Sequence, residues 1–312
     1  MAATYLPHGS DQLAEGARRR RATRPPWMER ASIPTRAVKF IVIAAIVVVM
    51  LYPFISVIAT SFASVEAANA GGLFPTSFSL VGYRSIFSGG VVEHALLVSV
   101  GITVVGTSLS VAFTVLLAYG LTRTRDVPGS KVVLYMVLAT MLFGAGIIPN
   151  YLLVKSLGLI NSYWALILPV LVNAFNLVVV RNFFMEIPRE MFESARIDGA
   201  SELQILRRIV VPLSKAVIAV IALFYAVGYW NDFFNALLYL NDSGKWPIQL
   251  VLNQYVLQGT PLSQIQNPNQ PPPPAQTVQM AVVVLATAPI LVVYPFAQRY
   301  FTKGVLTGAI KG

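Results

Sequence analysis

The sequence predicts an all-α, polytopic membrane protein with six transmembrane helices. Of its 312 residues, 56% are hydrophobic and only 12% are charged, about half of the charged share of a soluble domain. Several apolar runs reach the roughly 18 uncharged residues that let a helix cross the hydrocarbon core. A soluble domain with a single core does not fit this composition. Lipid must therefore be the solvent for much of the surface.

The chain divides into a basic tail, residues 1–36, and a transmembrane domain, residues 37–312. We expect the tail to be disordered; it either binds lipid headgroups or serves only as a topology signal. The first apolar run, of 23 residues (40–62), is too long for the apolar core of a signal peptide. We therefore interpret it as an uncleaved span, with Pro53 as a tolerated kink. The six predicted spans lie at about residues 40–62, 95–121, 132–148, 163–180, 216–240 and 278–296.

Basic residues set the predicted orientation. If the N-terminus is inside, 20 of the 23 lysines and arginines lie in inside segments, and only Arg84, Lys155 and Lys245 lie outside. This distribution follows the positive-inside rule, so both termini are predicted to be cytoplasmic. It also explains the net charge of +10 as contact with membrane lipid rather than with nucleic acid.

The sequence lacks the motifs typical of catalysis or metal binding. The chain has no cysteine, and His8 and His94 are far apart in sequence, which excludes thiolate sites and a multi-histidine metal site. It has no phosphate-binding Gly-x-x-x-x-Gly-Lys loop, so we expect no ATP hydrolysis, no catalytic residue and no cofactor in this chain. An ion-coupled secondary transporter remains an alternative, although such proteins place several ionisable groups at mid-membrane and here only Asp232 lies within a span.

Residues 186–213, between spans four and five, are predicted to form two short amphipathic helices. Pro188 suits the first helical position, Gly199 accepts the left-handed turn that ends the first helix, and Ser201 with Gln204 forms a capping box for the second. The predicted apolar faces are Met191, Phe192 and Ala195 in the first helix, and Leu203, Leu206, Ile209 and Val210 in the second. Such a segment either transmits force from a soluble partner or lies on the membrane as a connector.

The same segment carries a series of fixed residues. Glu193-Ser194-Ala195, Asp198-Gly199-Ala200, Ile209 and Pro212 resemble the signature of permease subunits of ATP-binding-cassette importers: Glu-Ala-Ala, two residues, Asp-Gly-Ala, eight residues, Ile, one residue, Leu, Pro. The chain departs from it at Ser194 and at Val211, and both changes are conservative. The resemblance implies the type I importer permease fold and a cytoplasmic coupling segment. The residues implied to contact an ATPase are Glu193, Ser194, Ala195, Asp198, Gly199 and Ala200.

Shorter patterns resemble the carbohydrate-uptake, maltose-permease-like branch of that family, and within it permeases for oligosaccharides derived from complex polysaccharides. They are Gly146–Pro149, Asn161–Ala165, Tyr229–Phe234 and Gln298–Phe301. The resemblance implies a bacterial cytoplasmic membrane protein that pairs with a second permease, usually a different one, although this chain does not exclude a homodimer. It also implies two cytoplasmic ATPases that bind ATP and magnesium, and an external solute-binding protein. A non-sugar solute is the alternative substrate, and the particular sugar is not predicted.

Polar residues inside spans four and five are candidates for the substrate path. Ionisable and amide groups are costly if they face lipid, so they should face the interior of the complex, and aromatic rings beside amides suit sugars. Alternatively, these groups bind a partner subunit or their own helix backbone, with Trp230 at the membrane interface. The candidates are Trp230, Asn231, Asp232 and Asn235 in span five, and Asn173 and Asn176 in span four.

The outer loop, residues 241–277, is a candidate contact for the binding protein. It contains Trp246, Tyr255 and the run Pro271–Pro274, which favours polyproline geometry. The loop either meets an external partner or acts as a rigid spacer. Because aromatic residues are enriched in interface cores, Trp246 and Tyr255 are the predicted contacts.

Overall fold

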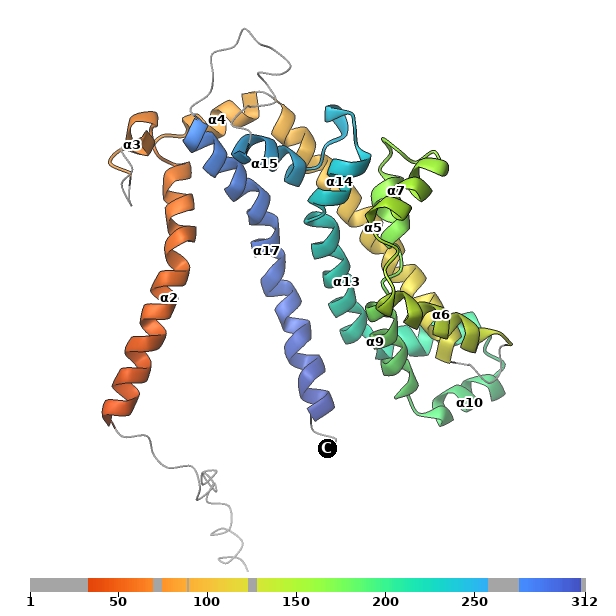
Figure 1. Ribbon diagram of the computed structural model, residues 1–312. Helices are drawn as coiled ribbons and strands as arrows, with labels where there is room; N and C mark the ends of the chain where they lie inside the picture. Colours follow the sequence, from red (N-terminus) through yellow and green to blue (C-terminus); the bar gives the residue numbers. More distant parts are fainter. Residues whose placement is uncertain (1–32, 70–74, 89, 123–127, 258–274, 310–312) are drawn as a thin grey trace, which may run out of the picture. The chain divides into compact units, whose positions relative to one another are not determined.

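The structure is a computed structural model that describes residues 33–69, 75–88, 90–122, 128–257 and 275–309 (Figure 1). The described residues are helical or irregular, apart from an isolated bridge between Ala63 and Phe78. Most of the basic tail and the four-proline run lie outside them. The chain forms two units that divide at Pro53 and Phe54, within helix α2 (Ile33–Ser61).

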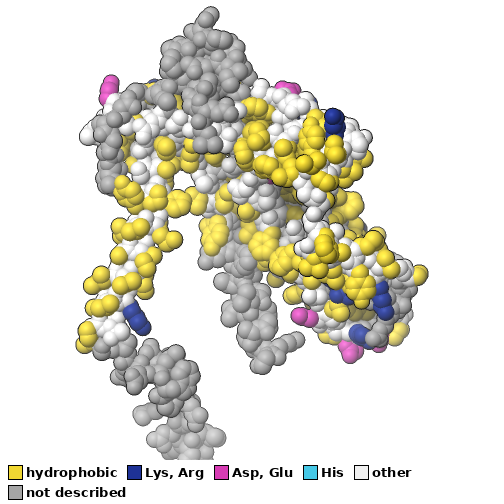
Figure 2. Space-filling view, viewed as in Figure 1, with side chains coloured by type: hydrophobic (Ala, Val, Ile, Leu, Met, Phe, Trp, Pro, Cys, Tyr) yellow, Lys and Arg dark blue, Asp and Glu magenta, His cyan; other side chains and the backbone are white. Residues whose placement is uncertain are grey.

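Three described helices are long and apolar enough to cross a membrane: Ile33–Ser61, Val91–Thr122 and Gln276–Pro295. They confirm helices at predicted spans one, two and six. They belong to α2, α5 (Val91–Thr122) and α17 (Ala275–Ala309). Hydrophobic side chains cover much of the described surface, as expected where lipid is the solvent (Figure 2).

Predicted spans four and five are each interrupted. Trp164–Val170 and Ala174–Met185 meet at 50°, and Glu202–Leu213 and Lys215–Trp230 meet at 84°. If each bent pair counts as one span, the described residues contain up to five spans, so the total of six stays a prediction. The helices of these regions are α8 (Trp164–Ile167), the 3-10 turn η1 (Leu168–Val170), α9 (Ala174–Met185), α13 (Lys215–Trp230) and α14 (Phe233–Tyr239).

The predicted third span is wrong in its extent. Helix α6 (Ser130–Leu142) is 13 residues long, and the next helix, α7 (Ile147–Ser156), begins after an irregular stretch. Gly146 has a φ of +82° in that stretch, a conformation that glycine adopts without strain. The apolar run therefore continues through a turn at which the helix stops.

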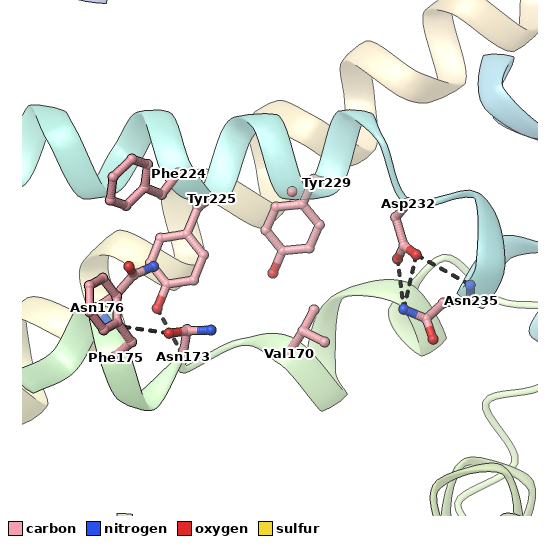
Figure 3. Close-up of a pocket in the computed structure, with 10 residues that line it drawn as sticks. Val170, Asn173, Phe175, Asn176, Phe224, Tyr225, Tyr229, Asp232 and Asn235 are labelled. Carbon is pink, nitrogen blue, oxygen red and sulfur yellow. Dashed lines mark hydrogen bonds between the residues drawn. The ribbon is translucent and has the colours of Figure 1, made fainter. Parts of the chain in front are cut away.

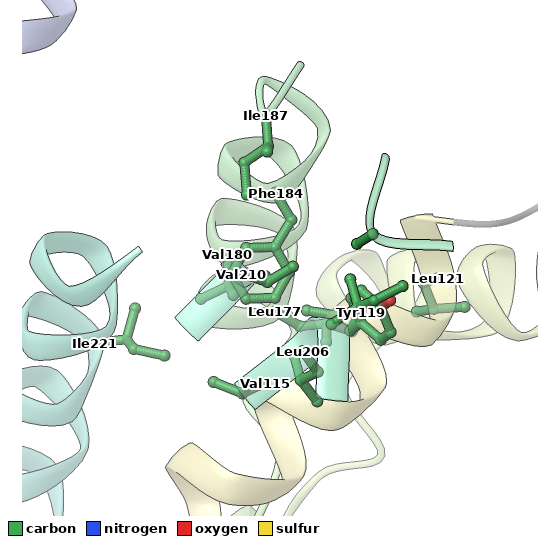
Figure 4. Close-up of a cluster of buried hydrophobic side chains, with 13 residues drawn as sticks. Val115, Tyr119, Leu121, Leu177, Val180, Phe184, Ile187, Leu206, Val210 and Ile221 are labelled. Carbon is green, nitrogen blue, oxygen red and sulfur yellow. The ribbon is translucent and has the colours of Figure 1, made fainter. Parts of the chain in front are cut away.

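The 186–213 segment forms α10 (Arg189–Ile197), α11 (Glu202–Ile205), a π-helical turn η2 (Leu206–Val210) and α12 (Val211–Leu213). It packs against the ends of α5 and α9 through a cluster of buried side chains (Figure 4). The cluster includes Val115, Tyr119, Leu177, Val180, Phe184, Leu206 and Val210. The remaining described helices are α3 (Val65–Asn69), α4 (Val81–Ser88), the 3-10 turn η3 (Ser243–Lys245) and α15 (Ile248–Leu257).

Helices α5 and α13 pack against each other (Figure 1), and two hydroxyl pairs join them. Ser110 Oγ lies 2.8 Å from Tyr229 OH, and Thr114 Oγ1 lies 2.7 Å from Tyr225 OH. One turn before Ser110, Gly106 lies against the Tyr229 ring, so that a Cβ at this position would approach ring carbons to 2.8 Å. Small residues and interhelical hydrogen bonds are the usual stabilising contacts between helices in lipid.

We predict that Gly106→Ala destabilises the chain. The Tyr229 ring is buried and its hydroxyl is hydrogen-bonded, so it cannot move aside freely, and overpacking of this kind costs about 1–3 kcal/mol. Gly101→Ala is the matched control, because a Cβ on the same helix at that position has no atom within 4 Å. The thermal unfolding midpoint of the purified protein in detergent should fall for Gly106→Ala alone. Equal midpoints for the two variants would contradict this packing.

Candidate functional site

A polar groove of about 380 Å³ lies where the broken helices of predicted spans four and five face each other (Figure 3). This volume is within the usual range for small-molecule sites. The described residues that line the groove are Val170, Asn173, Phe175, Asn176, Phe224, Tyr225, Gly228, Tyr229, Asp232 and Asn235.

The α13 side of the groove is largely aromatic. Phe224, Tyr225, Gly228, Tyr229 and Asp232 recur at the three- and four-residue spacings of one helix face. Both tyrosines are buried, and their hydroxyls pair with α5. Their rings are therefore fixed in orientation, and the groove has a rigid aromatic surface on this side.

The other side is formed at the start of α9. The Asn173 backbone N–H donates to Tyr225 OH at 2.9 Å, and Asn173 Oδ1 accepts from the Asn176 backbone N–H at 3.1 Å. Asn173 is therefore the N-cap of α9, a position that asparagine favours. The Tyr225 hydroxyl joins this cap to Thr114 of α5, which holds three segments together beside the groove.

Asp232 caps α14 in the same way. Its Oδ1 accepts from the Asn235 backbone N–H at 3.2 Å and from Nδ2 at 2.9 Å, and its Oδ2 accepts from Nδ2 at 3.1 Å. Among the ten described residues that line the groove, Asp232 carries the only charge. The groove therefore offers rings, amides and one carboxylate, a set that can cover an apolar sugar face and bind hydroxyl groups.

The structure brings together four of the six predicted path residues, namely Asn173, Asn176, Asp232 and Asn235. The other two predicted path residues, Trp230 and Asn231, do not line this groove. Trp230 is buried on another side of α13, where its Nε1 donates to the Ala286 backbone oxygen of α17 at 2.9 Å. Asn231 Nδ2 donates to the Val227 backbone oxygen at 2.9 Å.

Sequence reasoning missed the aromatic lining residues, which are Phe175, Phe224, Tyr225 and Tyr229. Those on α13 could have been found by stepping back from Asp232 at helical spacing, which reaches Gly228 and Tyr229 and then Phe224 and Tyr225. Selecting neighbours in sequence instead led to Trp230 and Asn231. Each step along a helix turns about 100°, so Asn231 and Trp230, one and two positions before Asp232, point away from the side reached three and four positions back.

Local geometry of the 186–213 segment follows the sequence closely. Gly199 has a φ of +78°, and the Gly199 and Ala200 N–H groups donate to the Arg196 and Ala195 carbonyls at 3.0 and 2.9 Å, which is a Schellman ending. Ser201 and Gln204 form the predicted capping box. The turn between the two helices is therefore fixed by its own hydrogen bonds.

The apolar faces of this segment are partly corrected. Ala195, Leu206 and Val210 are buried as predicted, but Leu203 is 59% exposed and Ile205 is fully buried in its place. Met191 is also exposed, and Ile197 is 86% exposed. Of the six signature residues, Ala195 lies inside the segment, while Glu193, Ser194, Asp198 and Gly199 are exposed and Ala200 is half-buried. Several charged side chains also gather around the segment (Figure 2).

Trp246 and Tyr255 attach the outer loop to the helices. Tyr255 is only 6% exposed in a cluster with α17 residues, and Trp246 is half-buried with its Nε1 donating to the Leu240 backbone oxygen at 3.1 Å. Neither ring is fully exposed, and Tyr255 in particular has little solvent-accessible area with which to contact a partner.

Comparison with known proteins identifies the class. Residues 17–307 match the family model described as binding-protein-dependent transport system inner membrane component. The chain is 51% identical to the polygalacturonan/rhamnogalacturonan transport system permease protein YtcP of Bacillus subtilis (strain 168) over 88% of this chain and 96% of YtcP. It is 49% identical to Protein LplC of the same organism, over 85% of this chain and 90% of LplC.

A solved structure agrees. The chain matches one chain of a bacterial ABC transporter involved in the import of the acidic polysaccharide alginate, with a TM-score of 0.81 and 29% identity, over 89% of this chain and 100% of that chain. The chain therefore belongs to the family of binding-protein-dependent transport system inner membrane components. It is a membrane permease subunit of an ABC importer.

Proposed function

We propose that the polar groove forms one side of the path for an oligosaccharide. The observation that carries this proposal is the combination of fixed aromatic rings with amides and a carboxylate in a cavity of about 380 Å³. Rings cover the apolar face of a pyranose, and the polar groups bind its hydroxyls. The named substrates of YtcP and of the alginate transporter support an oligosaccharide derived from a complex polysaccharide.

A second permease is proposed to complete this path. Phe175 and Phe224 line the groove yet are 54% and 45% exposed, so this chain leaves the groove uncovered. A different permease is the partner we favour, on the family resemblance. The substrate would then lie between the two subunits and contact both.

Cytoplasmic ATPases are proposed to bind the 186–213 segment and to supply the ATP hydrolysis. The positive-inside distribution supports a cytoplasmic location for this segment and for both termini. Its exposed residues Ile197, Asp198, Gly199 and Leu203 form a small protruding surface at the Schellman turn. Ala195 supports that surface from within.

The external binding protein is proposed to contact the exposed part of the outer loop. The base of the loop is fixed: Lys245 Nζ donates to the Asn161 backbone oxygen at 2.9 Å, and the Asp242 backbone N–H donates to Asn161 Oδ1 at 3.1 Å. His94 Nε2 lies 2.8 Å from the Gly244 backbone oxygen. Trp246 and Tyr255 also pack against the helices. The more exposed residues of the loop are therefore the ones available to a partner.

Cross-linking tests the proposed orientation and ATPase contact together. Since the chain has no native cysteine, Ile197→Cys introduces a single thiol at an 86% exposed position of α10. We expect a short thiol-to-amine cross-linker to join it to the ATPase subunit in native membranes. Leu152→Cys, which is exposed on α7 and is predicted to lie outside, should give no such product. A cross-link from Leu152→Cys and not from Ile197→Cys would overturn the orientation.

We predict that Gly199→Val uncouples ATP hydrolysis from sugar uptake. A β-branched residue at a φ of +78° is strained by roughly 1–3 kcal/mol and should distort the turn that faces the ATPase. Gly199→Asn should retain most of the uptake per ATP hydrolysed, because asparagine tolerates this conformation.

Gly158→Val is the control for strain alone, because Gly158 has a φ of +70° in the turn after α7 and, like Gly199, has no atom within 4 Å of an added Cβ. The measurement is uptake and ATPase activity in reconstituted complexes. Wild-type uptake by Gly199→Val would contradict the proposal that this turn couples ATP hydrolysis to transport.

We predict that Asp232→Asn changes the charge preference of transport. Asparagine is also a good N-cap, so α14 should persist, while the negative charge in the groove is lost. Since like charges in contact cost several kcal/mol, uptake of a galacturonate oligomer should rise at least about fivefold relative to a neutral oligomer of equal length. Asp232→Ala separates the two effects, because it also removes the cap. If the assembled Asp232→Asn complex takes up the galacturonate and neutral oligomers in the wild-type ratio, Asp232 does not line the substrate path.

A further inference from the structure

One hydrogen bond joins the 186–213 segment to α5. Tyr119 OH donates to Glu202 Oε2 at 2.6 Å, and Tyr119, near the end of α5, is only 9% exposed. A short bond from a hydroxyl to a carboxylate is among the stronger hydrogen bonds in proteins. Glu202 is the first residue of α11, so this bond fixes the start of that helix to α5.

The ion pair of Glu202 with Arg196 contributes less. Arg196 Nε lies 3.5 Å from Glu202 Oε1, and both side chains are about half exposed, at 46% and 54%. Exposed ion pairs of this kind are worth about 0–1 kcal/mol. The bond to Tyr119 is therefore the stronger of these two contacts, and it adds to the apolar cluster in which Leu206 and Val210 pack against α5.

The segment also has a covalent connection to the groove. Its last helix, α12, continues through Ser214 into α13 at an angle of 84°. Ser214 is fully buried, and its backbone N–H donates to the Val210 and Val211 carbonyls at 3.0 and 3.2 Å. A displacement of the segment is therefore passed directly to α13, which carries the groove tyrosines.

The bond to α5 and the covalent continuation into α13 lead to the two helices that the hydroxyl pairs join. Thr114 and Ser110, which pair with Tyr225 and Tyr229 of α13, lie on α5 only five and nine residues before Tyr119. Any sliding of α13 past α5 would stretch these pairs. The Glu202–Tyr119 bond opposes such sliding, because it ties the segment that continues into α13 to the end of α5.

We propose that Glu202 and Tyr119 are positioning residues that make the 186–213 segment, α5 and α13 move as one body during transport. This inference rests on the proposed coupling role of the segment. It assigns a function to two residues outside the signature, since neither belongs to the Glu-Ala-Ala or Asp-Gly-Ala positions.

The test is the ratio of sugar transported to ATP hydrolysed in the reconstituted complex. Tyr119→Phe should lower this ratio about tenfold, because a hydrogen bond to a charged group is lost. Glu202→Gln should lower it less, since an amide oxygen still accepts from the hydroxyl. Tyr135→Phe is the matched control, because this hydroxyl lies on an exposed side chain of α6.

The double variant tests whether the two residues act through their mutual bond. Tyr119→Phe/Glu202→Gln should be no worse than the more affected single variant, because each change weakens the same hydrogen bond. Additive losses, or a wild-type ratio for Tyr119→Phe in a complex that co-purifies with its ATPase, would overturn the proposal. If the Tyr119→Phe complex does not assemble, the transport-to-hydrolysis ratio of Glu202→Gln is the test, and a wild-type ratio for that variant would contradict the proposal. Gly199→Val in the same assay separates the two hypotheses. A wild-type ratio of sugar transported to ATP hydrolysed for Gly199→Val would contradict the coupling role of the 186–213 segment itself.

Discussion

The hydroxyl of Tyr225 allows a helix to be broken inside the apolar part of the chain. A break leaves backbone N–H groups without intrahelical partners, and hydrocarbon offers none in exchange. Tyr225 OH accepts from the Asn173 N–H at the start of α9 and pairs with Thr114 of α5, while Asn173 Oδ1 accepts from the Asn176 N–H. The break is thereby satisfied by side chains, and it opens the space that becomes the groove.

Close packing of α5 and α13 is the condition for this arrangement. The Tyr229 ring fits against Gly106 where no side chain would fit, and its hydroxyl reaches Ser110. Each such bond is worth only about 1 kcal/mol in lipid, because the separated helices also find partners. Their effect is geometric: they hold two aromatic rings at a fixed orientation toward the groove, on the helix that continues into the 186–213 segment.

Local features were predictable and distant ones were not. The left-handed turn at Gly199 and the Ser201–Gln204 capping box depend on neighbouring residues, and the structure confirms both. The helices at spans one, two and six follow from hydropathy. Asn173 and Asp232 were predicted as polar groups within continuous spans, whereas each caps a new helix after a break. The preference of asparagine and aspartate for the N-cap position was the visible signal. Trp230–Ala286 and Tyr119–Glu202 join residues 56 and 83 positions apart, and no local pattern indicates which partner each will meet.

The charge of the groove limits how an acidic substrate could be recognised. YtcP and the alginate transporter are named for acidic polysaccharides, yet the described lining of this groove has one carboxylate and no lysine or arginine. A uronate carboxylate in an apolar surrounding needs cationic or N–H partners, because an unpaired buried charge is very costly. The Asn235 amide already donates to both oxygens of Asp232, so the side-chain amides of Asn173 and Asn176 are the other amide N–H donors in the described lining. Because these donors are neutral, the described lining of the groove is better suited to the rings and hydroxyls of a sugar than to a carboxylate.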